Sequence, residues 1–276
     1  MAWLMLASSL VTLTTHRFVS LLLLFIAITI AAFTGIIHWQ ALLLLGFITA
    51  ICIIHLYYSH ISILKIGSEI ILVSCAIGLL IHALPGFNNL KYLDKAFVGA
   101  QSASFTLYFN FDKALIPFIL LACLPTLLVS KPVKNASRRQ WLLLIIAVPV
   151  LLIIATLAGG LGVEFHLPTW LPAFVISNIL FVSFAEEALF RGYLQQRLTQ
   201  WSGSPYLALI LTALLFGAAH FAGGPLLILF ATLAGLIYGL AWMWSGKLWL
   251  AVSFHFGLNL VHLLFFTYPI RMVSGQ

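Results

Sequence analysis

Long apolar runs follow one another along almost the whole 276-residue chain. A helix needs about 20 apolar residues to cross the hydrocarbon core of a bilayer. We therefore predict an all-α fold, a polytopic transmembrane helix bundle with about 8–10 spans. The candidate spans are 18–37, 40–58, 66–84, 114–130, 141–160, 171–192, 206–221, 225–244 and 248–267, and the apolar segment 3–15 is shorter than a span.

The composition is typical of a protein that lies in lipid. Hydrophobic residues make up 63% of the chain and charged residues 7%, whereas a soluble domain carries about 25% charged residues. The net charge of +7 comes from Lys and Arg scattered in short loops, where they act as topology signals, so we expect no nucleic-acid partner. We predict an integral, multi-pass membrane protein in contact with lipid, in the inner or plasma membrane if its source is bacterial.

Polar residues that could perform chemistry recur within the apolar runs of the C-terminal half. Ionisable side chains are costly in lipid and usually face a bundle interior or a water-filled cavity, so they are candidates for function. The candidates are Glu186, Glu187 and Arg191, then His220, then His255 and Asn259. Glu186 lies 34 residues before His220, which lies 35 residues before His255. Each interval is about the length of one crossing of the bilayer and back.

Helix geometry predicts that the first two groups lie at one depth. Glu186 is 17 residues before Gly203 and His220 is 17 residues after it. An antiparallel hairpin that turns at Gly203 therefore sets them level, roughly 25 Å from the turn. The small residues 217–219 before His220 favour a close approach of neighbouring helices.

The spacing within each group predicts which side chains share a face. Arg191 is four residues after Glu187, so the two can pair and Glu186 is left for chemistry. His255 and Asn259 are also four residues apart and should face the same cavity.

These residue types form a complete set for hydrolysis of an amide without a covalent intermediate. Desolvation of Glu186 suits it to take a proton from water, and His220 can hold that water and pass a proton to the leaving amine. His255 and Asn259 can donate hydrogen bonds to the developing oxyanion. The chain is thus predicted to hydrolyse peptides within the membrane, with no cofactor.

A zinc-dependent reaction with the same residues is the alternative. One Glu and two His make the ligand set of a catalytic zinc site, with water in the fourth position. The motif HExxH is absent from the sequence, and this absence favours the metal-free reaction, in which no residue is a metal ligand.

Three motifs resemble those of the CAAX-protease and bacteriocin-processing family of intramembrane endopeptidases, also called the abortive-infection family. They are Glu186-Glu187-Ala-Leu-Phe-Arg191 (EExxxR), Phe216-Gly-Ala-Ala-His220 (FxxxH) and His255-Phe-Gly-Leu-Asn259 (HxxxN). The resemblance covers about residues 171–267. It implies that Glu186 and His220 activate water, that His255 and Asn259 stabilise the oxyanion, and that Glu187 and Arg191 have supporting roles.

We predict one integral membrane domain over 1–276. Residues 1–170 would form N-terminal helices with an outer loop at 85–113, and 171–267 would form the catalytic helix core. The predicted partner is a membrane-bound or lipidated peptide or protein. The rival functions are a transporter that relays protons through the buried Glu and His and a catalytically inactive scaffold. The oligomeric state and the identity of the substrate do not follow from the sequence.

Overall fold

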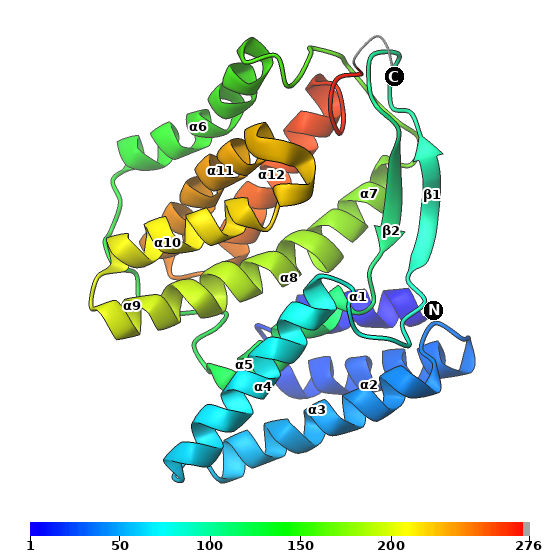
Figure 1. The fold of residues 1–276 in the computed structure, drawn as a ribbon, viewed down its shortest axis with the longest axis vertical. Coiled ribbons are helices and arrows are strands. Elements are labelled where there is room, and N and C mark those ends of the chain that lie inside the picture. Colours follow the sequence, from blue (N-terminus) through cyan, green and yellow to red (C-terminus); the bar gives the residue numbers. More distant parts are fainter. Residues whose placement is uncertain (273–276) are drawn as a thin grey trace. The chain divides into compact units, whose positions relative to one another are not determined.

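The computed structural model describes residues 1–272 and is mostly helical (Figure 1). Within the described residues, six helices are long and apolar enough to cross a membrane, which confirms an integral, multi-pass protein. They are α3 (Trp39–Tyr57), α4 (Ser62–Leu80), α6 (Arg138–Leu157), the continuous helix Leu171–Ser202, α11 (Gly224–Ser245) with the turn that precedes it, and α12 (Leu248–Phe265). The shorter apolar helices are α1 (Ala2–Thr12), α2 (Arg17–Phe33), α5 (Ile116–Cys123) and α10 (Pro205–Ala218).

The contacts within the chain divide it into two compact units. The first unit comprises Met1–Leu90, Tyr108–Leu128 and Leu180–Leu189. The second unit comprises Lys91–Leu107, Val129–Ile179 and the described residues from Phe190 onward. The helix Leu171–Ser202 therefore contributes its middle to the first unit and its two ends to the second.

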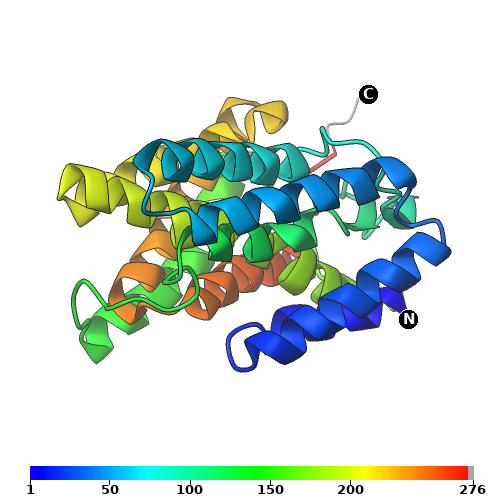
Figure 2. The same cartoon turned by 90° about the horizontal axis from the view of Figure 1, so that it is seen from below.

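The first unit is built on helical hairpins. The hydroxyl of Ser20 in α2 donates a hydrogen bond to the carbonyl of Ser9 in α1, at 2.6 Å. Helices α3 and α4 run side by side (Figures 1 and 2), and Nδ1 of His55 lies 2.8 Å from Oγ of Ser68 across them. Buried polar groups are thus paired between the helices, as an apolar environment requires.

The prediction of a spanning helix over 114–130 is wrong. Helix α5 ends at Cys123, and Leu124 is extended, with φ −142° and ψ 101°. Because Pro125 follows, the α conformation is disfavoured at Leu124. The apolar residues beyond this point continue without a helix until α6 begins at Arg138.

The predicted outer loop 85–113 contains regular structure that its polar composition did not indicate. Strands β1 (Leu90–Ala96) and β2 (Phe105–Phe109) pair in a two-stranded sheet (Figure 1). In the second unit, Leu107 of β2 joins a small apolar cluster with Phe174 and Leu263. This segment is therefore a packed element of the fold.

Helix α11 lies at the centre of the second unit, against α6, α10 and α12 (Figure 1). The predicted turn before α10 is confirmed: Gly203 has a φ of +69°, and the Ser204 hydroxyl accepts a hydrogen bond from the backbone N–H of Leu207. The predicted close approach at Gly217 is also confirmed, because a Cβ there would lie 2.7 Å from the carbonyl oxygen of Ile228 in α11.

The helix Leu171–Ser202 is interrupted by two π-helical stretches. It begins as α7 (Leu171–Ile176), becomes π-helical over Ser177–Ser183, returns to α-helix in α8 (Phe184–Glu187), and is π-helical again over Ala188–Gln195 before α9 (Gln196–Ser202). A π-helical stretch has i→i+5 hydrogen bonds, and such stretches are frequent at functional sites. The two acidic candidates, Glu186 and Glu187, therefore lie in a short α-helical segment between two π-helical stretches.

The carboxylate of Glu164 links two loops of the second unit. Glu164, in the loop after α6, accepts hydrogen bonds from the backbone N–H of Gln101 at 3.0 Å and from the hydroxyl of Ser102 at 2.7 Å. Nε2 of His166 lies 3.1 Å from the same carboxylate. Burial alone would raise the pKa of Glu164, but these hydrogen bonds and the electrostatic interaction with His166 together lower its pKa from 4.5.

We expect this contact to make the protein less stable in acid. Because the pKa of Glu164 is lowered on folding, its contribution to stability is present above 4.5 and is lost as the pH falls through the folded-state pKa. Thermal unfolding in detergent, followed from neutral pH to below pH 4.5, should show this loss in the wild type. The Glu164→Gln protein should unfold at a lower temperature at neutral pH and lose less on acidification; an unchanged pH dependence would contradict the assignment.

Candidate active site

Two of the predicted site residues gather around the ring of Phe216 in the second unit. The ring centroid of His220 lies 4.8 Å from that of Phe216, and the ring centroid of His255 lies 5.7 Å from it. Phe216 is near the end of α10, and His255 lies within α12. The fold thus brings together two histidines that are 35 residues apart in the sequence.

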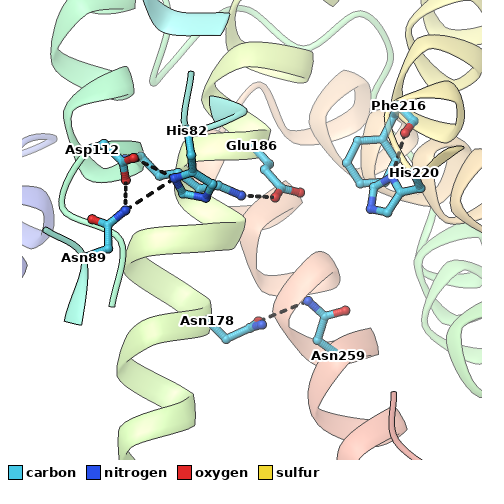
Figure 3. Close-up of polar contacts among 9 residues, drawn as sticks. His82, Asn89, Asp112, Asn178, Glu186, Phe216, His220 and Asn259 are labelled. Atoms are coloured by element: carbon cyan, nitrogen blue, oxygen red, sulfur yellow. Dashed lines mark hydrogen bonds and ion pairs between the residues drawn. The ribbon is translucent and has the colours of Figure 1, made fainter. Parts of the chain in front are cut away.

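The apolar run 206–221 had predicted that His220 lies inside a helix. It lies instead just beyond the end of α10. Its Nδ1 donates a hydrogen bond to the carbonyl of Phe216 at 2.8 Å (Figure 3), which satisfies one of the open carbonyls at the helix end. Since a carbonyl can only accept, Nδ1 carries a hydrogen and Nε2 of the neutral ring is the nitrogen that can take up a proton.

His255 is held by aromatic packing. Its ring is stacked on that of Tyr238, with centroids 4.7 Å apart and an interplanar angle of 10°. Phe216 meets the same imidazole edge-on, at an interplanar angle of 89°. Because His255 is only 5% exposed, its orientation is fixed by rings contributed by α10 and α11.

Arg191 packs against the rings of Phe216 and Tyr238. Its side chain is fully buried and its guanidinium lies 4.4 Å from the ring centroid of Phe216 and 5.2 Å from that of Tyr238. Nη2 also donates a hydrogen bond to the carbonyl of Gly235 at 3.1 Å. A Cβ at Gly235 would lie 3.2 Å from this nitrogen. The absence of a side chain at Gly235 therefore leaves room for the guanidinium. Arg191 therefore supports the rings that hold both histidines.

Removing this charge should destabilise the second unit. We expect Arg191→Met to lower the free energy of unfolding by about 3 kcal/mol, the scale seen when one partner of a buried charged group is removed. Arg197→Met is the matched control, because its guanidinium contacts one ring, that of Tyr193, at 5.7 Å. Chemical unfolding of both variants in detergent measures the difference, and equal losses would contradict the supporting role.

Asn259 has a partner on the long helix. Its Nδ2 donates a hydrogen bond to Oδ1 of Asn178 at 3.2 Å (Figure 3). Asn178 lies in the first π-helical stretch and is buried. Asn259 lies one turn after His255 on α12. This contact orients the amide predicted to serve the oxyanion.

Glu186 has a charged partner that the sequence did not indicate. Nζ of Lys113 lies 3.5 Å from Oε1 of Glu186, within the first unit. Glu187 is fully buried, and its pairing with Arg191 stays a prediction. The convergence of Glu186 on His220 and His255 also stays a prediction, since Glu186 belongs to the first unit and the histidines to the second.

Three residues around the candidates were given no role by the sequence: Lys113, Phe216 and Tyr238. Phe216 stands in the FxxxH motif, and a motif position shared with a histidine was the only signal available for it. Tyr238 and Lys113 belong to none of the three motifs. Packing within the second unit places Tyr238 against His255, and packing within the first unit places Lys113 beside Glu186. Within residues 1–272, no group of three or more His, Cys, Asp or Glu side chains is spaced to hold a metal ion, and the metal-free and zinc-dependent reactions both stay predictions.

The apolar helices define a multi-pass membrane protein. In its second unit, Arg191, His220 and His255 lie around the ring of Phe216. Residues 168–261 match the family described as type II CAAX prenyl endopeptidase Rce1-like. All three motifs lie within this segment, so the match confirms the family resemblance over the part of the chain that contains them.

A curated relative covers a similar share of the chain. The protein YpbD of Bacillus subtilis (strain 168), described as uncharacterized, is 30% identical over 105 residues. The matched segment is 37% of this chain and spans half the length of that relative. No solved structure matches the chain.

Proposed function

We propose that this protein is an intramembrane endopeptidase that hydrolyses peptide bonds of membrane-associated substrates. The observation that carries the proposal is the gathering of His220 and His255 around Phe216, inside a segment that matches a family of CAAX prenyl endopeptidases. A membrane-embedded pair of imidazoles with a carboxylate is expensive in lipid. Water activation accounts for all three groups at once.

In the proposed reaction Glu186 acts as general base. Its carboxylate takes a proton from a water molecule held by Nε2 of His220 as the water oxygen bonds to the scissile carbonyl carbon. The carbonyl electrons move to oxygen, and the negative charge is stabilised by hydrogen bonds from His255 and from the amide of Asn259. As the oxyanion collapses, the C–N bond breaks and the amine leaves with the proton taken from water.

Glu187 and Arg191 have supporting roles in this proposal. Arg191 holds the ring of Phe216 through its guanidinium face, and Asn178 orients the amide of Asn259. One hydrogen of the Asn259 amide is donated to Asn178, and the other is the one proposed to donate to the oxyanion. The proposed site therefore has four residues that would act on substrate or water, namely Glu186, His220, His255 and Asn259, and other residues that would orient them.

The proposed substrate class follows from the expected position of the site within the membrane. The apolar side chains exposed on the helices, such as Leu142, Ile145 and Ile153 of α6, suit contact with lipid. A peptide that reaches polar residues in the same layer must itself be held at the membrane, by an apolar segment or a lipid anchor. Membrane-bound or lipidated peptides are therefore the proposed substrates, and prenylated CAAX proteins are one such class.

The test is a comparison of the peptides released by the wild type and by the Glu186→Gln variant. Membranes carrying each protein are incubated, and released peptides are identified by mass spectrometry. Peptides that appear only with the wild type support the proposal, and identical peptide sets contradict it. Repeating the wild-type reaction after exhaustive chelation distinguishes the two chemistries: retained activity in zinc-free protein supports the glutamate-type reaction, and activity restored only by zinc supports the metal-dependent alternative.

A further inference from the structure

An ammonium group stands against the carboxylate of the proposed general base. Lys113 and Glu186 have exposed side-chain fractions of 15% and 13%, and their charged atoms are 3.5 Å apart. Lys113 begins the short turn that leads into α5. An exposed ion pair contributes little, but two mostly buried groups of opposite charge interact more strongly because water screens them less.

The backbone that carries Lys113 is fixed by a second polar network in the same unit. The buried carboxylate of Asp112 accepts hydrogen bonds from the backbone N–H of Lys113 at 2.8 Å and from Nδ2 of Asn89 at 2.9 Å. Nδ1 of His82 lies 2.6 Å from its other oxygen (Figure 3). Asn89 also accepts a hydrogen bond from the backbone N–H of Phe111 at 2.8 Å. Lys113 thus projects from a rigid segment and not from a loose loop.

We propose that Lys113 is a positioning residue for Glu186, which it holds in one orientation and keeps in the charged form. This inference rests on the proposed function of Glu186. A carboxyl group in apolar surroundings tends to become neutral, and a protonated acid cannot take a proton from water. A nearby cation offsets that tendency. Lysine suits the role because its ammonium is a compact point charge on a flexible stem.

The first test separates charge from structure. We expect Lys113→Met to lower kcat by about a hundredfold with KM little changed, because a misplaced base costs about that much, and Lys113→Arg to restore most of the loss. Lys91→Met is the matched control: Lys91 lies 3.3 Å from Asp94, three residues away, and both are exposed. If the methionine variant does not fold, Lys113→Gln replaces it. Wild-type kcat in the uncharged variant would overturn the inference.

The second test needs no enzymatic activity. Thermal unfolding is measured for the wild type, Lys113→Met, Glu186→Gln and the double variant. If the two groups interact, the loss of melting temperature caused by Lys113→Met should be smaller when Glu186 is already neutral. Additive losses would overturn the inference.

The two tests together distinguish failure of the inference from failure of the proposed function. A protein that cleaves peptides normally after loss of Lys113 retains the proposed function and loses the positioning role. A wild type that cleaves nothing, yet shows coupling in the unfolding cycle, has the ion pair without the proposed enzyme and overturns the catalytic part of the inference.

Discussion

Replacing Glu186 with glutamine should abolish cleavage of membrane-held peptides while the protein is still inserted and folded. The amide has nearly the same size as the carboxylate but cannot accept a proton from water, so the loss should reach about 10⁴-fold, the upper range for a general base. The measurement is the initial rate of cleavage of a substrate found by comparing released peptides. Purification yield and melting temperature report on folding.

The matched control is Glu69→Gln, which removes a carboxylate from α4 in another apolar helix. We expect its cleavage rate to stay near that of the wild type. If both variants lose activity equally, the effect reflects a general loss of buried charge and Glu186 has no special role. Wild-type rates in the purified Glu186→Gln protein would end the proteolysis hypothesis.

Replacing His220 should have the second largest effect. Its Nδ1 already donates to the carbonyl of Phe216, so only Nε2 can serve the water. His220→Asn should keep a donor near the position of Nδ1 and remove the group at Nε2. We expect it to lower kcat by about a thousandfold with little change in melting temperature, whereas His220→Ala should lower both.

The control for His220 is His60→Ala, because His60 is exposed and lies near the ring of Tyr58, 6.2 Å away. Its replacement should change neither the rate nor the melting temperature. Activity retained in His220→Asn would show that this histidine only caps the end of α10. The proposed water site would then have to be assigned to other residues.

Much of the helical framework could be predicted from apolar run length and from turn residues. Gly203 and Gly246 both adopt positive φ at helix ends, a conformation that glycine adopts at little cost, and they set the turns that bring α10 and α12 back. The failure at 114–130 had a visible signal, because Pro125 interrupts the apolar run. The prediction of a helix there relied on the length of the apolar run and did not take the proline into account.

The surroundings of the site could not be predicted, because they depend on packing between distant segments. Lys113 was interpreted as part of an aqueous loop, and only its burial against the long helix gives it a partner. The two π-helical stretches depend on the backbone hydrogen-bond register, which leaves no mark in a pattern of apolar residues. The helix is π-helical over Ala188–Gln195, whereas the prediction that Glu187 pairs with Arg191 used α-helical spacing; that pairing stays a prediction.

The ring of Phe216 has one more consequence for how charge can move in the second unit. It touches both imidazoles, and a phenyl group contains neither a hydrogen-bond donor nor an acceptor of the kind that conducts protons. The ring therefore cannot pass a proton from His220 to His255. A proton that passed from one imidazole to the other would have to go around this ring and not through it.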